Sequence, residues 1–141
     1  MLKVRQAELS DATSIAALVT QLGYPTGPDD MVDRLTRMLD DPRHTVMVAD
    51  ADGAVVGMGA ACIDHGPSHD GLYARVTGLV VDAKARGRGV GAFLMQQIEE
   101  WSRERGADRV TLTSGSYRPD AHKFYEAIGY QATGTRFMKR V

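Results

Sequence analysis

The most constraining feature of this sequence is a turn of alternating arginine and glycine, Arg86–Gly91, between an apolar run and an amphipathic segment. Its three glycines permit backbone conformations that other residues avoid and let a ligand approach the main-chain N–H groups. The apolar stripe of Leu94, Ile98 and Trp101 predicts that a helix follows. A helix N-terminus, accessible amides and basic side chains favour an anion such as a pyrophosphate. The turn therefore predicts an anion site, although a basic surface turn without a ligand has the same composition.

Two better-known phosphate loops do not fit this turn. The Walker loop ends in Gly-Lys-Ser/Thr, a tripeptide that the sequence lacks. The spacing Gly87-x-Gly89-x-x-Ala92 satisfies a relaxed dinucleotide fingerprint, but that fingerprint follows the first strand of its domain. Here only about fifty residues remain, and the next strand ends in Thr113-Ser114 where an acidic ribose-binding residue is expected. These mismatches exclude a Rossmann domain.

Hydrophobic patterns along the whole chain predict one domain, residues 1–141. Alternating runs predict strands at Leu2–Ala7, Thr45–Ala49, Ala54–Cys62, Leu72–Val81, Arg109–Ser114 and from Tyr130 onward. Helical spacing predicts helices that end at Gly23 and at Asp41, and two more at Ala92–Arg105 and Pro119–Ile128. An antiparallel meander followed by crossover helices gives a mixed, mostly antiparallel sheet flanked by helices. The expected class is α/β (α+β).

Composition limits the partners. With 141 residues and 43% hydrophobic content, the chain can bury a core without disulfides. A net charge of -1 does not provide the broad positive field of nucleic-acid binders. One cysteine, no apolar leader and no long apolar stretch favour a cytoplasmic protein that does not bind membranes. A small-molecule partner is therefore expected.

Gly78, inside the strand that precedes the turn, gives a second indication of a ligand. Glycine within a strand marks a β-bulge or a close approach of the backbone to a ligand. A ligand whose phosphates bind at the turn could run back along Leu79, Val80 and Val81, using main-chain groups of a distorted strand. The alternative is a glycine that makes room for a helix packed on the sheet.

These features together resemble one enzyme family. The segments Leu79-Val80-Val81-Asp82 and Arg86–Gly91, with Phe124-Tyr125-Glu126 before Gly129-Tyr130, are similar to the GNAT superfamily of N-acetyltransferases. The resemblance covers nearly the whole chain. It implies acetyl-CoA as co-substrate and a sheet whose fourth and fifth strands splay apart, here Leu72–Val81 and Arg109–Ser114.

The resemblance also implies the residues that bind acetyl-CoA. The loop and helix start bind the pyrophosphate, and the strand binds the pantetheine by main-chain hydrogen bonds; Phe124 completes the cofactor site. The expected cofactor-binding residues are Leu79, Val80, Val81, Arg86, Gly87, Arg88, Gly89, Val90, Gly91, Ala92 and Phe124.

For catalysis, the resemblance implies that Tyr125 assists the thiolate leaving group, whereas its helical spacing with Phe124 and Ile128 would equally suit a core aromatic. Ser114 stands where many relatives carry asparagine and could relay a proton through water. Many relatives place a glutamate on the strand that here reads Arg75-Val76-Thr77-Gly78-Leu79. Because this segment contains no carboxylate, no general base is assigned. His122 could help.

The expected reaction is transfer of an acetyl group to a primary amine of a small molecule by direct attack, and the alternative is a non-catalytic acyl-CoA sensor. The segment from Arg118 to Lys139 is similar to aminoalkylphosphonate acetyltransferases, so Arg118 or Arg136 could meet an anionic acceptor. The loop Asp64–Asp70 lacks a familiar metal spacing, and no metal is expected. An exposed last strand could pair across a two-fold axis in a homodimer.

Overall fold

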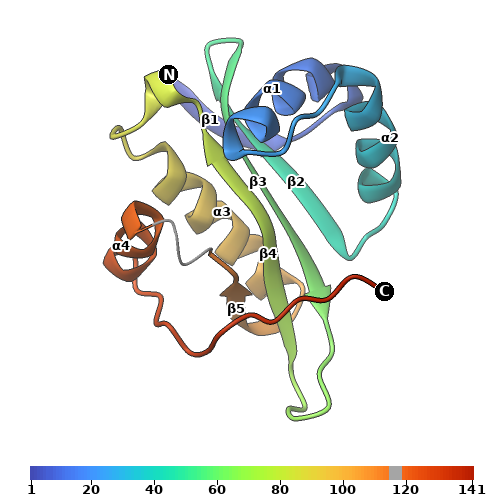
Figure 1. Ribbon diagram of the computed structural model, residues 1–141, viewed down its shortest axis with the longest axis vertical. Helices are drawn as coiled ribbons and strands as arrows, with labels where there is room; N and C mark the ends of the chain where they lie inside the picture. The colour runs from blue at the N-terminus through green and yellow to red at the C-terminus, as the bar shows by residue number, and fades with distance from the viewer. Residues whose placement is uncertain (115–118) are drawn as a thin grey trace. The chain divides into compact units, whose positions relative to one another are not determined.

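A five-stranded sheet organises the chain, with strand order β1-β2-β3-β4-β5 (Figure 1). The computed structural model describes residues 1–114 and 119–141. Contacts between Cα atoms divide the chain into two compact units, Met1–Thr111 and Leu112–Val141. Arg118 lies outside the described residues.

The strands of the first unit form a mixed sheet, as predicted. The three neighbouring pairs from β1 to β4 are antiparallel, and β4 with β5 is the one parallel pair. Arg109 of β5 stacks over the ring of Tyr73 at 5.5 Å, and Thr111 Oγ1 donates to the carbonyl of Ala74 at 3.4 Å, so both strands advance in the same direction. The strands are β1 (Leu2–Gln6), β2 (His44–Ala51), β3 (Ala54–Asp64), β4 (Leu72–Val81) and β5 (Ala107–Leu112).

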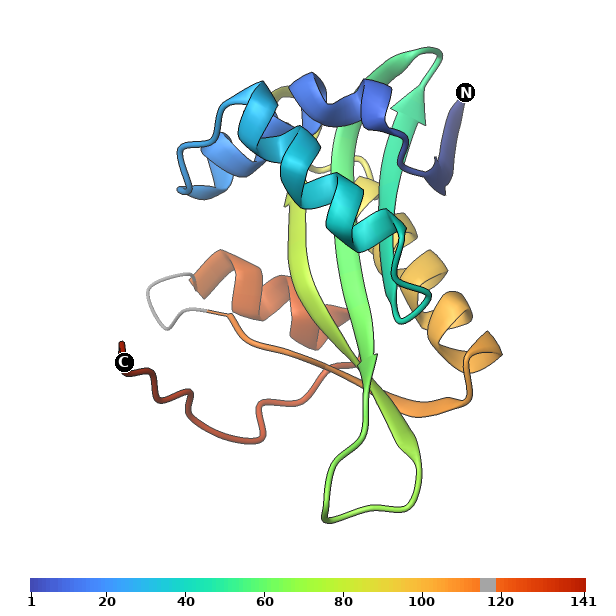
Figure 2. The ribbon, with the colours of Figure 1, turned by 90° about the vertical axis from the view of Figure 1, so that its right-hand side faces the viewer.

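Helices cover both faces of this sheet (Figure 2). Helices α1 (Ala12–Leu22) and α2 (Pro28–Leu39) pack on one face, and α3 (Val90–Glu104) packs on the other. Alternation along the strands makes this possible, because successive side chains point to opposite faces. The core under α1 and α2 includes buried side chains from every layer: Ile15, Leu18, Met31, Leu35, Val46, Val48, Met58, Ala60 and Val80.

Two glycines of β3 set the distance between α3 and the sheet. A Cβ atom at Gly57 would lie 3.1 Å from Leu94 Cδ1 and 3.2 Å from Val90 Cγ1, and one at Gly59 would lie 2.9 Å from Ile98 Cδ1. Real Cβ atoms essentially never come as close as that last distance. Helix α3 therefore packs closely on β3 because these two positions carry no side chain.

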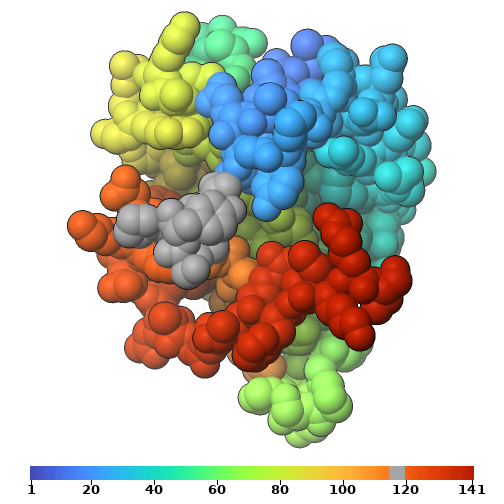
Figure 3. All heavy atoms as spheres, viewed as in Figure 1, coloured from blue at the N-terminus to red at the C-terminus, as the bar shows by residue number. Residues whose placement is uncertain are grey.

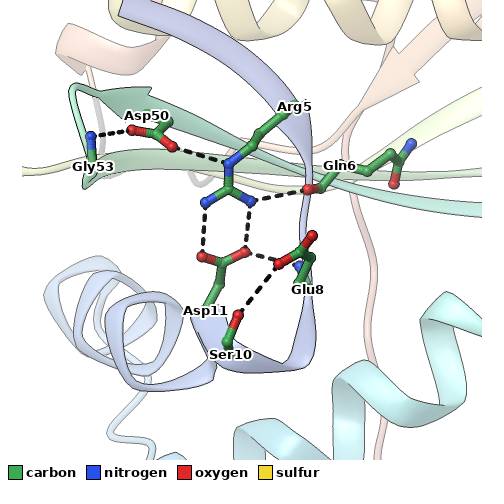
Figure 4. Close-up of polar contacts among 7 residues, drawn as sticks. All are labelled: Arg5, Gln6, Glu8, Ser10, Asp11, Asp50 and Gly53. Carbon is green, nitrogen blue, oxygen red and sulfur yellow. Dashed lines mark hydrogen bonds and ion pairs between the residues drawn. The ribbon is translucent and has the colours of Figure 1, made fainter.

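A partly buried ion network ties β1 to the start of α1 (Figure 4). The Arg5 guanidinium donates to both carboxylate oxygens of Asp11, at 2.9 and 3.0 Å, and its Nε donates to Asp50 at 3.0 Å. Asp50 also accepts from the Gly53 amide in the β2–β3 turn at 2.7 Å. Hydrogen bonds from Arg5 hold the pKa of the Asp11 and Asp50 carboxyls below their ordinary value. The network stabilises the strand, helix and turn as one unit.

The second unit contains helix α4 (Pro119–Ala127), one residue shorter than predicted. Gly129 has a left-handed φ of 100°, and the amide of Tyr130 donates to the carbonyl of Tyr125 at 2.9 Å, which closes the helix end. The prediction of a strand from Tyr130 is wrong, because residues 130–141 carry no regular secondary structure. A strand forms only where a neighbour accepts and donates its hydrogen bonds, and alternation in a sequence does not report a neighbour.

Among the described residues, no helix has the length and apolar character needed to cross a membrane.

Candidate functional site

The loop between β4 and α3 starts with a capped turn. Asp82 follows β4, and its Oδ1 accepts from the Lys84 amide at 2.9 Å while its carbonyl accepts from the Ala85 amide at 2.8 Å. These bonds form a short 3₁₀ turn, Ala83–Ala85, in which Ala85 is buried. An aspartate that caps its own turn fixes where the chain leaves the sheet.

Left-handed glycines then turn the chain into α3. Gly87 has φ 78° and Gly89 has φ 80°, and Gly89 is the N-cap of α3. A Cβ atom at either position would meet nothing within 4 Å, so backbone conformation and not space demands glycine. Gly91 departs from this expectation, since it lies inside α3 and is not among the glycines with positive φ. The helix begins at Val90, two residues earlier than predicted.

The N-terminus of α3 can accept an anion. The helix ladder begins with the amide of Phe93, which donates to the Gly89 carbonyl at 3.0 Å, and Gly89 provides no side-chain cap. The amides of Val90, Gly91 and Ala92 precede that bond, as the first amides of every helix do. The first turn contains no acidic residue. Partial positive charge from these amides favours a phosphate group there.

Basic side chains add to this field. Lys84, Arg86 and Arg88 are exposed on the loop, and Figure 3 shows the segment between β4 and α3, in yellow, at the surface beside the N-terminal helices. Arg86 is partly committed to the fold, because its Nε donates to the Val81 carbonyl at 3.1 Å. The loop combines amides and charges of the kind that suit a pyrophosphate, and the binding of acetyl-CoA by these residues stays a prediction.

Helix α1 anchors the loop through a residue that the sequence did not single out. Gln21 Nε2 donates to Asp82 Oδ2 at 3.0 Å, and Gln21 Oε1 accepts from the Ala83 amide at 3.0 Å. The hydrogen bond from Gln21 Nε2, followed by that from the Lys84 amide, holds the pKa of the Asp82 carboxyl below its ordinary value. An exposed glutamine near the end of a helix has no local pattern that marks such a contact.

The strand before the loop is irregular where Gly78 predicted a bulge. Ala60 of β3 pairs with Gly78, whereas the next residue, Ala61, pairs with Val76, so Thr77 is an extra residue on β4. Beyond the bulge, β4 pairs regularly with β3, and Val80 faces the core under α1 and α2. The main-chain roles of Leu79, Val80 and Val81 toward a ligand stay predictions. The splay of β4 from β5 also stays a prediction. The contacts of Arg109 and Thr111 with β4 lie at Tyr73 and Ala74, near the start of β4.

Three aromatic residues of the second unit pack together. Tyr125 packs edge-to-face against Phe124 with ring centroids 5.1 Å apart and against Tyr130 at 6.0 Å. Ser114 does not end a strand as predicted, because β5 stops at Leu112. Instead, the Ser114 carbonyl lies 3.4 Å from His122 Nε2. The roles of Tyr125, Phe124 and Ser114 toward a substrate remain predictions.

Cys62 and the Asp64–Asp70 loop lie elsewhere in the first unit. Cys62 is buried on β3, with its Sγ 3.5 Å from Arg75 Nη2. Within the described part of the chain, no three His, Cys, Asp or Glu side chains form a group that could hold a metal ion.

Comparisons with known proteins point to one enzyme family. The family model described as "Acetyltransferase (GNAT) family" matches residues 11–130. An aminoalkylphosphonate N-acetyltransferase of Salmonella typhimurium is 30% identical over 142 residues, which cover 97% of this chain and 90% of the relative. An aminoglycoside N(6')-acetyltransferase of Stenotrophomonas maltophilia is 29% identical over 134 residues, with 92% and 86% covered.

Solved structures share the fold. An aminoglycoside N-acetyltransferase in complex with CoA matches with a TM-score of 0.89 at 21% identity, over 100% of this chain and 95% of that one. A transcriptional regulator from Bacillus halodurans matches with a TM-score of 0.92 at 23% identity over 100% of both chains. From the family model and the full-length relatives, the chain belongs to the acetyltransferase (GNAT) family and is an N-acetyltransferase whose acetyl donor is acetyl-CoA.

Proposed function

We propose that this enzyme acetylates a primary amine of a small molecule by direct attack on acetyl-CoA, with Tyr125 assisting the departing thiolate. The structure of the loop before α3 is the observation that supports binding of the acetyl donor. Two left-handed glycines, an uncapped helix N-terminus and three basic side chains converge on one short segment. These are the groups that a pyrophosphate needs.

Each expected cofactor-binding residue has a chemical role in this proposal. The amides from Gly87 to Ala92 hold the pyrophosphate, and Arg86 and Arg88 offset its charge. The main chain of Leu79, Val80 and Val81 holds the pantetheine arm, and Phe124 packs on it. The fold neighbour in complex with CoA supports the assignment at the level of the fold.

The chemistry requires three groups. The neutral amine attacks the acetyl carbonyl, main-chain N–H groups beside the Thr77–Gly78 bulge stabilise the negative oxygen, and the C–S bond breaks. Tyr125 then gives its proton to the thiolate, since a phenol with an ordinary pKa near 10 can donate to a thiolate whose conjugate acid is near 8.5. The proton released by the amine leaves through water, and water returns a proton to the Tyr125 phenolate before the next turnover. Ser114 and His122, which lie together, are the groups we propose for that relay.

The relatives support a small-molecule acceptor. By their names, two of them act on an aminoalkylphosphonate and on the 6'-amine of an aminoglycoside. Both classes are small molecules with amino groups. We therefore propose that the acceptor is a small amine.

A panel of amines assayed for CoA release, with product masses measured, tests the proposal. Tyr125→Phe should lower kcat while leaving the affinity for acetyl-CoA nearly unchanged, because the ring and its packing remain. Tyr130→Phe is the matched control, since Tyr130 lies beside Tyr125 but carries no proposed role. Equal kcat values for wild type and Tyr125→Phe would remove the acid assignment.

Ligand-induced stabilisation separates the enzyme from a sensor. Acetyl-CoA at 100 times its Kd should add about 2.7 kcal/mol to the free energy of unfolding, and NAD should add nothing. Stabilisation by acetyl-CoA without CoA release over the whole panel would favour the non-catalytic acyl-CoA sensor. No stabilisation would contradict the proposed use of the loop.

We further propose that residues 1–141 act as one domain and that the chain forms a homodimer through residues 130–141. The family model spans both units, which supports the first point. Phe137 and Met138 are exposed large apolar side chains in that segment, which supports the second. Light scattering should give the molar mass of a dimer for the full chain and a lower average molar mass for Phe137→Ser.

A further inference from the structure

On the face of the sheet that carries α1 and α2, the side chains change from apolar to charged at the β4 bulge. On one side of Thr77, this face presents the buried core residues Met58, Ala60 and Val80. On the other side, the register pairs Cys62 with Arg75, and alternation along β3 places Asp64 on the same face. The apolar core thus gives way to a charged pair within a few residues of the bulge.

The Arg75 guanidinium is held by one of its nitrogens. Nη2 lies 3.3 Å from Asp64 Oδ2 and 3.5 Å from Cys62 Sγ. The Arg75 side chain is 54% exposed and that of Asp64 is 35% exposed, so solvent reaches the pair. Within the described residues, both side-chain hydrogen bonds of Arg75 use Nη2, and neither Nε nor Nη1 donates one. An arginine presents its donors in a planar fork that suits two oxygens of one oxyanion.

The position of this fork relative to the bulge matches a short acceptor. Arg75 and Gly78 pair with Cys62 and Ala60, which are two residues apart on β3, so with Thr77 bulged they lie roughly 7 Å apart along the sheet. The proposed function has the amine react beside the Gly78 main chain. An acceptor whose amine and oxyanion are a few bonds apart, with the arginine side chain, spans this distance.

We propose that Arg75 binds an oxyanion of the acceptor, so that the preferred substrates are short primary amines that carry a phosphonate or a carboxylate. Asp64 is a positioning residue, because it fixes one guanidinium nitrogen and leaves the other edge to the ligand. This inference rests on the proposed acetyl transfer. It locates the anion contact on β4, in place of the Arg118 and Arg136 contacts expected from the sequence.

Three amines of similar length test the inference: 2-aminoethylphosphonate, β-alanine and the uncharged propylamine. The wild type should use one or both anionic amines with a kcat/KM well above that for propylamine, and their ratio identifies the preferred oxyanion. Arg75→Gln should raise KM for the anionic amines by roughly 10- to 100-fold, as expected for a lost hydrogen bond to a charged group. Its kcat/KM for propylamine should stay within about twofold of the wild type.

Two further variants separate recognition from structure. Arg75→Lys keeps the charge but loses the fork, so it should recover part of the lost affinity. Arg103→Gln removes another exposed arginine, which pairs with Glu100 on α3, and should leave all three amines unaffected. Melting temperatures of all variants show whether each one folds.

The outcomes are distinguishable. Turnover of propylamine as efficient as that of both anionic amines in the wild type would overturn this inference alone. An equal loss for all three amines in Arg75→Gln would do the same, since it would indicate a structural arginine. No turnover of any amine, together with no stabilisation by acetyl-CoA, would overturn the proposed function as well.

Discussion

Gln21 in α1 donates to the carboxylate of Asp82 at 3.0 Å, across sixty-one positions of the sequence. The same glutamine accepts from the Ala83 amide, so a single side chain spans the first two residues after β4. Helix α1 therefore anchors the loop of the proposed anion site, in addition to the strand and the helix that the loop connects.

Replacing Gln21 by leucine should loosen the loop with little effect on the fold, because Gln21 is exposed. We expect KM for acetyl-CoA to rise roughly 3- to 10-fold, the value of one or two modest hydrogen bonds. Steady-state kinetics at saturating amine provide the measurement. Gln96→Leu, an exposed glutamine of α3, is the control, and an unchanged KM in Gln21→Leu would show that the contact does not order the loop.

Alanine at Gly87 or Gly89 should weaken acetyl-CoA binding. Both glycines are left-handed with open space around them, so the substitution costs about 1–2 kcal/mol of backbone strain without a clash. Gly53, with φ 96° and equally open surroundings in the β2–β3 turn, is a matched control. Calorimetric titration should give a lower affinity for Gly87→Ala and Gly89→Ala only. Comparable affinities in all three variants would contradict a role for the loop backbone.

Gly59→Ala should destabilise the first unit by about 1–3 kcal/mol, because its new Cβ would lie 2.9 Å from Ile98 Cδ1. Ile98→Val removes that methyl group and should recover much of the loss in the double variant. Guanidinium unfolding of the two single variants and the double variant gives the coupling energy. Strict additivity would mean that Ile98 does not limit the packing of α3.

The free energy of unfolding should fall in acid because of Asp11 and Asp50. Their pKa values are lower in the folded chain than in the unfolded one, chiefly through hydrogen bonds from Arg5. The contribution is present above the unfolded pKa of about 4 and is lost as pH falls through the folded pKa.

Arg5→Met removes the cause of this shift, so the loss of stability between pH 6 and pH 3 should become smaller than in the wild type. Urea unfolding across this range tests it. Arg103→Met, which breaks an exposed pair, should keep the wild-type slope. A wild-type slope in Arg5→Met would assign the acid sensitivity to other carboxyls.

Local signals predicted much of this fold, and contacts between distant segments account for the rest. The bounds of β4 and the bulge at Gly78 were predicted because alternation and a lone glycine are local features. The strand from Tyr130 was wrong because its formation depends on a neighbouring strand. Gly91 shows that even a glycine inside a recognisable loop need not have a special conformation.

The candidate site shows the same division. The glycine spacing and the basic residues of the loop were readable in the sequence. Gln21 and Arg75 were not, because their partners Asp82 and Asp64 reach them only through helix packing and strand pairing. Asp82 belonged to the family motif, yet its part in anchoring the loop depends on α1.

Thr77 adds one residue to β4 without turning any other side chain around. Arg75 and Gly78, on either side of the bulge, face the same layer as their partners Cys62 and Ala60, so a strand that lacked Thr77 would continue the regular ladder with every side chain on its present face. A single-codon deletion could therefore erase the distortion and preserve both the core and the charged pair. Gain or loss of that one codon offers evolution, or a protein engineer, a simple route between a plain strand and one shaped for a ligand.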